Sequence, residues 1–312
     1  MKTTCFADLS LSRLMLGTVQ FGLPYGIANR LGQPSYKTVR DIICCAYQGG
    51  VNCLDTATTY GTSEEVIGKV LWESGLQDKV VVVTKIMREI PDKNISSRDA
   101  DNLAGNAVRL SLKRLRLKRL PVCLFHSEQN FRYIESLLKL REKGVIGHVG
   151  VSVETPSAAA KIISSGLAEA IQMPTNVFDS RFTKRGLFQK AKHRKIAVFV
   201  RSVYLKGLLF LKDIEIPPAL KRVIPVRKKI LSLADEAGIT PAELAVRYIL
   251  GIQGTTSVVI GMESLEQTRQ NLSLFARGPL EPDLMKRISD AVPDLPDTIL
   301  MPCKWPPSER RC

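Results

Sequence analysis

The sequence predicts an α/β protein built as a (β/α)8 barrel, a closed barrel of eight parallel strands with an outer layer of helices. Short apolar runs recur eight times along the 312 residues, and helix-like segments lie between them. Strands that alternate with helices pair in parallel, because parallel pairing needs long crossover connections. Eight such units in a chain of this length indicate closure into a barrel. We expect residues 1–312 to form one barrel domain.

The expected elements follow one another regularly. The strands lie at residues 13–22, 51–56, 80–85, 121–126, 146–152, 168–173, 196–202 and 256–261. The clearest helices, which have capping residues in front and glycine at the end, lie at 36–50, 63–75, 135–144, 155–166, 240–251 and 264–278. Residues 213–225, which follow the seventh strand, are expected to form the longest loop.

Composition excludes several classes of protein. A hydrophobic share of 45% and a charged share of 24% are ordinary for a globular protein. No apolar run is long enough to span a membrane, and the first residues lack the apolar core of a secretory signal. The seven cysteines contain no C-x-x-C pair. We therefore expect reduced thiols in a cytoplasmic protein, with neither a disulfide framework nor a metal site.

The net charge of +15 has two readings. Basic clusters lie at residues 109–121 and in the tail at 308–312. The favoured reading of the first cluster is a solvated helix face whose leucines at 110, 112, 115 and 117 turn partly inward. The other reading is attraction to anionic partners such as phosphorylated cofactors. No nucleic-acid-binding signature is present, so nucleic acid is not an expected partner.

A doubly wound dinucleotide-binding sheet is the alternative architecture. That fold predicts a G-x-G-x-x-G turn after an early strand. No two glycines of this sequence stand two positions apart. The barrel is therefore favoured.

Polar residues stand where neighbouring strands are expected to end. Asp55 closes the second strand and Tyr60 follows it, Lys85 closes the third strand, and His126 closes the fourth. In a barrel, function lies at these carboxyl ends. Each residue alone has a structural explanation, such as a turn aspartate, a lysine that reaches to the rim, or a core histidine. Their common placement favours a shared site.

These residue types suit acid catalysis. A tyrosine with an ordinary pKa of about 10 is a poor proton donor at neutral pH, and a nearby ammonium lowers that pKa. A carboxylate holds the ammonium in place, and a histidine donates a hydrogen bond or a proton to a substrate oxygen. Without a nucleophile or a metal set, the group suits proton donation to a carbonyl while a nicotinamide supplies hydride.

The segment "LDTATTYGTSEE" at residues 54–65 resembles the D-T-A-x-x-Y-G-x-S-E segment of the aldo-keto reductase family. Lys85 in "TK" and His126 in "LFH" extend the resemblance, which covers nearly the whole chain. It implies a TIM barrel and the reduction of aldehydes or ketones. It also implies a nicotinamide cofactor, usually NADPH, lying extended across the carboxyl face of the barrel. By this match, the catalytic tetrad is Asp55, Tyr60, Lys85 and His126.

The resemblance also implies cofactor-binding residues. Arg201 stands where an aromatic ring usually stacks on the nicotinamide, and a planar guanidinium can stack in the same way. Glu263 stands near the position where relatives carry a serine or a basic residue for the 2′-phosphate, and a carboxylate there would repel that group. The family's usual cofactor and the net charge of +15 make NADPH the expected cofactor, with NADH as the alternative. The matched positions are Ser152, Gln172, Arg201, Ser202, Gly207, Gly261, Gln267 and Asn271.

The substrate pocket is expected to include the loop at residues 18–35, with Phe21, Tyr25, Asn29 and Gln33 as lining residues. Its segment "LPYGIANRLGQ" resembles a branch of the family found with surface-sugar and polysaccharide genes. An anionic or sugar-linked carbonyl compound could meet the cations at positions 30, 201 and 206, which are otherwise ordinary loop cations.

A second function class is a cofactor-binding regulatory subunit on the same barrel, of which channel β subunits are the example. The fold alone does not separate the two classes. The intact tetrad favours the enzyme.

Overall fold

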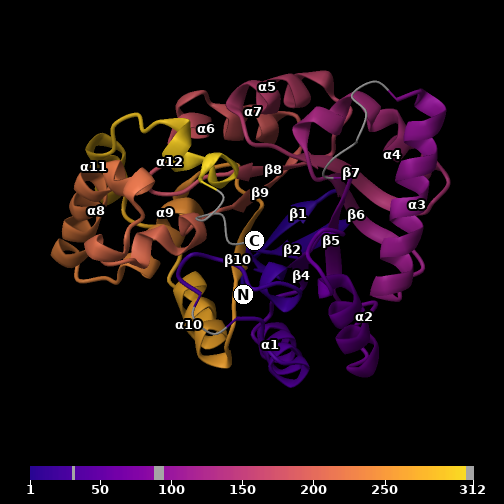
Figure 1. The fold of residues 1–312 in the computed structure, drawn as a ribbon, viewed down its shortest axis with the longest axis horizontal. Coiled ribbons are helices and arrows are strands. Elements are labelled where there is room, and N and C mark those ends of the chain that lie inside the picture. The colour runs from indigo at the N-terminus through magenta and orange to yellow at the C-terminus, as the bar shows by residue number, and fades with distance from the viewer. Residues whose placement is uncertain (30–31, 88–94, 307–312) are drawn as a thin grey trace.

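Eight parallel strands close into a barrel inside a ring of helices (Figure 1) in the computed structural model, which describes residues 1–29, 32–87 and 95–306. The order around the barrel is β10-β3-β4-β5-β6-β7-β8-β9. All eight expected strands are confirmed. Their bounds are β3 Leu14–Gly17, β4 Cys53–Asp55, β5 Val81–Ile86, β6 Leu120–Phe125, β7 Ile146–Ser152, β8 Ala170–Pro174, β9 Ala197–Arg201 and β10 Ser257–Gly261.

The six helices predicted from their end signals are confirmed. They are α1 Tyr36–Gln48, α2 Ser63–Glu73, α4 Ile134–Glu142, α5 Pro156–Ser165, α9 Pro241–Gly251 and α10 Leu265–Ala276. The other helices are α3 Ser97–Leu115, α6 Arg181–Lys184, α7 Leu187–His193, α8 Ile224–Glu236, α11 Pro282–Ala291 and α12 Asp297–Leu300. No helix in the described ranges is long and apolar enough to cross a membrane.

The basic cluster at 109–121 lies at the end of α3 and extends into β6. Leu115 is buried, whereas Leu110 is 43% exposed, so the expected inward turn of Leu110 is wrong. The inner face of α3 is formed instead by Ala100, Ala104, Val108, Ser111 and Leu115. Inward positions on a helix recur every three or four residues, and Leu110 does not fall on one of them. Its side chain therefore lies outside the buried face. The tail cluster at 308–312 lies outside the described residues.

The segment after β9 is more ordered than the expected loop. Two 3-10 turns, Asp213–Glu215 and Pro218–Val223, lead directly into α8 at Ile224. Proline is tolerated at the start of a helical turn, where its missing N–H has no partner to lose. Leu220 and Val223 are fully buried, so this segment is part of the packed outer layer.

An antiparallel hairpin that the sequence analysis did not predict precedes the barrel. Strands β1 (Thr3–Phe6) and β2 (Leu9–Ser12) pair with each other, and β2 leads directly into β3. Phe6 and Leu11 belong to the same apolar cluster as the inward barrel residues Met15 and Phe199. The hairpin therefore closes the amino-terminal end of the barrel, and in Figure 1 β1 and β2 lie across its centre.

A charged cluster ties this hairpin to the barrel wall. His148 on β7 contacts Asp8 of the hairpin turn through Nε2 at 2.6 Å and Glu169 through Nδ1 at 3.1 Å. The Glu169 carboxylate also pairs with Arg141 at 3.1 Å. The hydrogen bond to Glu169 raises the pKa of His148, burial opposes this, and Asp8 adds to the rise.

We expect this cluster to make stability depend on pH. The pKa of His148 is higher in the folded chain than its usual 6.5, so its contribution is full below that pH. It is lost as the pH rises through the folded value. A difference of one pKa unit corresponds to about 1.4 kcal/mol. Urea unfolding at pH 6 and pH 8.5 should show a larger loss of stability in the wild type than in His148→Gln. Equal losses in the two proteins would contradict the prediction.

Candidate active site

A cavity of about 750 Å³ opens at the carboxyl ends of the barrel strands. Asp55, Tyr60 and His126 line it, while Lys85 lies just beneath, only 1% exposed. All eight residues that the sequence analysis assigned to the cofactor also line this cavity. The structure therefore brings together the predicted residues, which are spread over more than 200 positions of the chain.

Lys85 and Asp55 form an ion pair inside the barrel. The Nζ atom of Lys85 is 2.6 Å from Oδ1 of Asp55 and donates a second hydrogen bond to the carbonyl oxygen of Thr56 at 2.8 Å. Burial lowers the pKa of Lys85, and the Asp55 carboxylate opposes that effect. The idea that Lys85 reaches out to the rim is thus wrong, because the ammonium stays inside with its carboxylate.

Tyr60 lies above this pair. The Nζ atom of Lys85 is 5.0 Å from the centre of the Tyr60 ring, and the His126 ring meets that ring edge-on at 5.7 Å. The Nδ1 atom of His126 is 3.2 Å from the hydroxyl of Thr59. His126 is partly exposed to the cavity, so it is not a closed core histidine.

Close backbone packing sets the position of the Tyr60 turn. A Cβ atom on Gly22 would lie 1.8 Å from the carbonyl oxygen of Tyr60. Gly61 has a φ of +54°, and a Cβ there would lie 2.3 Å from the carbonyl oxygen of Gly22. Gly22 lies in the loop after β3, residues 18–35, called the first barrel loop. Only glycine at both positions allows this loop and the turn that carries Tyr60 to pack so closely.

Gln172 connects the ion pair with the rest of the cavity. Its Nε2 atom donates to Oδ1 of Asp55 at 2.7 Å, while its Oε1 atom is buried without a hydrogen-bond partner among the described residues. Oε1 of Gln20 is in the same condition, and both residues line the cavity. Buried acceptors without partners are costly unless something donates to them. A carboxamide or hydroxyl donor of a bound nicotinamide dinucleotide fits this need.

Unusual backbone conformations shape the loop after β9. Ser202, Leu205 and Lys206 all have positive φ, although none is glycine. Such residues store strain and gather at functional loops. Gly207 has a φ of +92°, and a Cβ there would lie 2.5 Å from that of Ala28. The β9 loop and the first barrel loop thus pack together along the cavity.

Arg201 is held in place at the end of β9. Its guanidinium donates to the carbonyl oxygen of Val153 at 2.9 Å, to Glu154 at 2.7 Å and to the hydroxyl of Ser202 at 3.1 Å. An ion pair therefore lines the cavity where relatives are expected to present an aromatic ring.

The far side of the cavity is formed by the loop after β10 and one face of α10. Gln267, Gln270, Asn271 and Leu274 recur at helical spacing along that face. The side chain of Asn271 donates to the carbonyl oxygen of Gln267 at 2.8 Å and accepts from the hydroxyl of Tyr204 at 3.3 Å.

The first barrel loop lines the cavity only in part. Tyr25 and Asn29 line it as expected. Phe21 is fully buried in the core, and Gln33 donates to the carbonyl oxygen of Phe21 at 2.8 Å instead of facing the cavity. These two assignments are therefore wrong, since the loop uses both side chains to fix its own shape. Arg30 lies outside the described residues.

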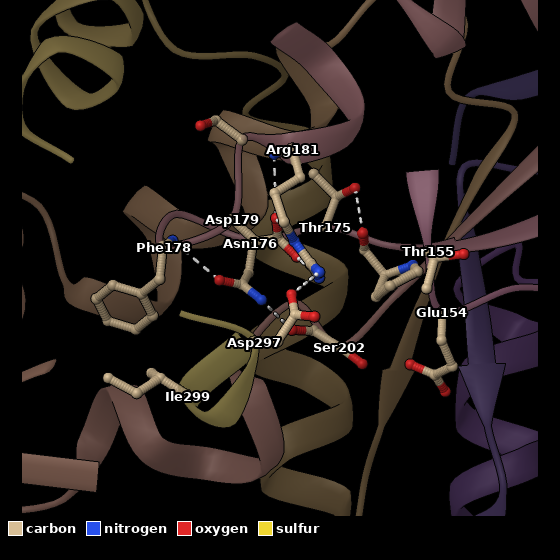
Figure 2. A network of polar contacts seen from close by, with 12 residues as sticks. Glu154, Thr155, Thr175, Asn176, Phe178, Asp179, Arg181, Ser202, Asp297 and Ile299 are labelled. Carbon is tan, nitrogen blue, oxygen red and sulfur yellow. Dashed lines mark hydrogen bonds and ion pairs between the residues drawn. The ribbon is translucent and has the colours of Figure 1, made fainter. Parts of the chain in front are cut away.

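The carboxyl-terminal segment completes the rim, which the sequence analysis missed. Figure 2 shows Arg181 between Asp179 and Asp297, at 2.8 Å and 2.7 Å, so that α12 is tied to the turn after β8. The chain then brings Pro302 and Cys303 to the cavity. No local motif marks these residues, because their place depends on this distant ion pair.

Figure 2 also shows the anchor of the β9 loop. The Nδ2 atom of Asn176 donates to the carbonyl oxygen of Ser202 at 3.1 Å, and its Oδ1 accepts from the N–H of Phe178 at 2.9 Å. Asn176 is 2% exposed and is not among the residues that line the cavity. It therefore positions Ser202 and does not face the cavity itself.

Residues 1–29, 32–87 and 95–306 contain no cluster of side chains that could bind a metal ion. They contain no group of three or more His, Cys, Asp or Glu side chains arranged to hold an ion. The six cysteines in those ranges are free thiols.

Comparison with known proteins agrees with this geometry. The model of the Aldo/keto reductase family matches residues 13–293. The chain belongs to that family. It is therefore an NAD(P)H-dependent oxidoreductase, as the resemblance of residues 54–65 implied.

Similar proteins include two from Bacillus subtilis and one solved structure. YqkF, an uncharacterized oxidoreductase of Bacillus subtilis (strain 168), is 25% identical over 285 residues, which cover 85% of this chain and 88% of that protein. The aldo-keto reductase YhdN of the same organism is 28% identical over 217 residues, covering 67% and 64%. The holo form of aldo-keto reductase AKR11C1 from Bacillus halodurans superposes with a TM-score of 0.77 at 21% identity, covering 96% of this chain and 99% of that one. At that identity, the structural likeness establishes the fold.

We expect the ion pair to support the stability of this reductase. Lys85→Met leaves the Asp55 carboxylate buried without its cation, and breaking such a pair costs about 3–5 kcal/mol. The double variant Asp55→Asn/Lys85→Met removes both charges and should recover at least half of that loss. Urea unfolding measures both.

Lys79→Met is the matched control, because Lys79 is exposed just before β5. Its effect should stay within about 0.5 kcal/mol. A Lys85→Met protein as stable as this control would show that the pair contributes nothing to folding.

Proposed function

We propose that this aldo/keto reductase reduces an aldehyde or ketone to an alcohol at the cavity, with Tyr60 as the proton donor. The observation that carries the proposal is the buried Lys85–Asp55 pair, whose ammonium lies 5.0 Å from the centre of the Tyr60 ring. An ammonium beside a phenol stabilises the phenolate, which eases release of the proton. Asp55 keeps the ammonium charged and fixed.

His126 is proposed to orient the substrate. It lines the cavity next to Tyr60, so a ring N–H can donate to the carbonyl oxygen that Tyr60 protonates. When bound, the reduced nicotinamide supplies the hydride. The protein contributes position and charge in a site where the ion pair is closed off from water.

The cofactor assignment rests on the residues that line the cavity. We propose that Ser152 and Gln172 hold the nicotinamide carboxamide, with Arg201 beside the ring. Ser202 and Gly207 belong to the loop that lies along the middle of the dinucleotide, and Gly261, Gln267 and Asn271 meet the adenosine half. NADPH is the form that the family resemblance implies, with NADH as the alternative. The choice between them depends on the residues around the adenosine ribose, where the two cofactors differ by a 2′-phosphate.

A sugar-derived or anionic carbonyl compound is our proposal for the substrate. The cavity is lined by Tyr25 and by Lys206, whose ammonium lies 4.6 Å from the Tyr25 ring centre. Asn29 also lines it, although its amide is bonded to the backbone of its own loop. A polyhydroxylated or charged substrate is recognised by such groups.

We also propose that residues 1–312 act as one barrel domain in the cytoplasm, where free thiols persist.

The substrate class is tested with a panel of simple aldehydes, ketones, keto acids and keto-sugars. Oxidation of NADPH and NADH is followed at 340 nm. Faster turnover of the sugar and acid carbonyls than of matched neutral ketones supports the proposal. Cofactor binding without turnover of any carbonyl compound would favour the regulatory alternative.

We expect Tyr60→Phe to lower turnover by about a hundredfold or more, the usual size of acid catalysis. Affinity for the cofactor should hardly change, because the ring remains in place. Tyr36→Phe is the matched control, since the hydroxyl of Tyr36 donates to Glu73 outside the cavity. Single-turnover kinetics with the best substrate of the panel measure the effect. Near-normal turnover by Tyr60→Phe would rule out this proton donor.

A further inference from the structure

The carboxylate of Glu263 lines the cavity just after the end of β10. We propose that Glu263 makes this reductase select NADH over NADPH by accepting hydrogen bonds from the adenosine ribose hydroxyls. The inference rests on the proposed function, because it needs a nicotinamide dinucleotide in the cavity.

The order of strands places Glu263 at the adenosine end. In the closed barrel β10-β3-β4-β5-β6-β7-β8-β9, β10 stands opposite β6. His126 follows β6, and Glu263 follows β10, so the two lie across the barrel from each other. Beyond Glu263 the cavity continues over the face of α10 that presents Gln267 and Asn271. An extended dinucleotide that has its nicotinamide beside His126 and crosses the barrel places its adenosine half there.

The chemistry of a carboxylate favours a ribose over its phosphate ester. An ionised carboxylate only accepts hydrogen bonds, so it pairs with the 2′- and 3′-hydroxyls. A 2′-phosphate has no such donor and carries nearly two negative charges. In doubly wound folds, an acidic residue that holds the ribose 2′-hydroxyl likewise goes with NAD.

The carboxylate of Glu263 has no cation beside it among the described residues. Burial raises its pKa, and the one opposing effect is a hydrogen bond from the side chain of Gln20. A nearby cation would lower that pKa, and none among the described residues does so. Arg269, on α10, is exposed and is not among the residues that line the cavity. A 2′-phosphate would therefore meet a half-buried anion without a local cation to offset it.

The two cations that line the cavity, Arg201 and Lys206, are bound to groups away from Glu263. Arg201 is paired with Glu154 at 2.7 Å, and Lys206 lies over the ring of Tyr25. Both belong to β9 and the loop that follows it. The described part of the chain thus offers no phosphate-binding cation at the α10 end of the cavity.

The carboxylate is also fixed in position. The backbone N–H of Glu263 donates to Oε1 of Gln267 at 2.8 Å, which ties the loop to α10. The Gln20 amide lies so close to Gly261 that a Cβ there would be 2.4 Å from its Nε2. Gln20 therefore covers the end of β10 and contacts the Glu263 carboxylate from the first barrel loop. These contacts oppose a rotation of Glu263 away from the ribose.

Binding of the oxidised dinucleotides tests the inference without any turnover. Calorimetric titration of the wild type should show NAD+ bound at least tenfold more tightly than NADP+. Glu263→Arg should shift that ratio by tenfold or more towards NADP+, and Glu263→Gln should shift it less, in the same direction. The glutamine variant keeps the shape of the side chain, so it serves where the arginine variant does not fold.

Glu266→Arg is the matched control. Glu266 is exposed on the first turn of α10, where it accepts from Gln270 at 3.1 Å, and it does not line the cavity. This variant changes the net charge as much as Glu263→Arg does, yet the ratio should stay within twofold of the wild type. Preference for NADP+ in the wild type, or an unchanged ratio in Glu263→Arg and Glu263→Gln, would overturn the inference and leave the proposed function standing. Failure of both dinucleotides to bind the wild type would overturn the proposed function as well.

Discussion

The ion pair between Lys85 and Asp55 lies inside the barrel, where neither side chain exposes more than 5% of its surface. Taking an ammonium and a carboxylate out of water costs several kcal/mol for each ion, which close contact and further hydrogen bonds must offset. The carbonyl oxygen of Thr56 and the amide of Gln172 provide those bonds. Because Asp55, Lys85 and Gln172 end or nearly end three different strands, the pair also fixes how the open end of the barrel is arranged. The position of Tyr60 depends on that arrangement.

Strand ends were the part of the site that the sequence could predict. Asp55, Lys85 and His126 each follow an apolar run, and parallel strands bring their carboxyl ends to the same face. Glycine-terminated helices were predictable for a similar reason, since capping is local. The hairpin at β1 and β2 was missed, because two strands of four residues leave almost no periodic signal.

Other features depend on contacts between distant segments, which no local pattern encodes. Pro302 and Cys303 reach the cavity because Arg181 holds Asp297, more than a hundred positions away. Phe21 and Gln33 were expected to face the cavity, but their side chains stabilise the loop that carries them. Asn176 lies next to the cavity, yet both ends of its amide are used by backbone groups. In each case, a specific hydrogen bond or ion pair decided the role of a residue whose type alone was ambiguous.

The net charge of the protein acts on a cofactor from a distance, and single side chains act on it in the binding site. These two effects can favour different cofactors. The net charge of +15 attracts any anionic dinucleotide from a distance and so favours encounter. Salt screens that field beyond about 8 Å at physiological ionic strength, so it is a poor means of distinguishing two cofactors that differ by one phosphate. A half-buried group within about 4 Å of that phosphate is screened far less and acts through a lower effective dielectric constant. The overall basicity of the chain is therefore compatible with a local carboxylate at Glu263 that disfavours the more highly charged cofactor.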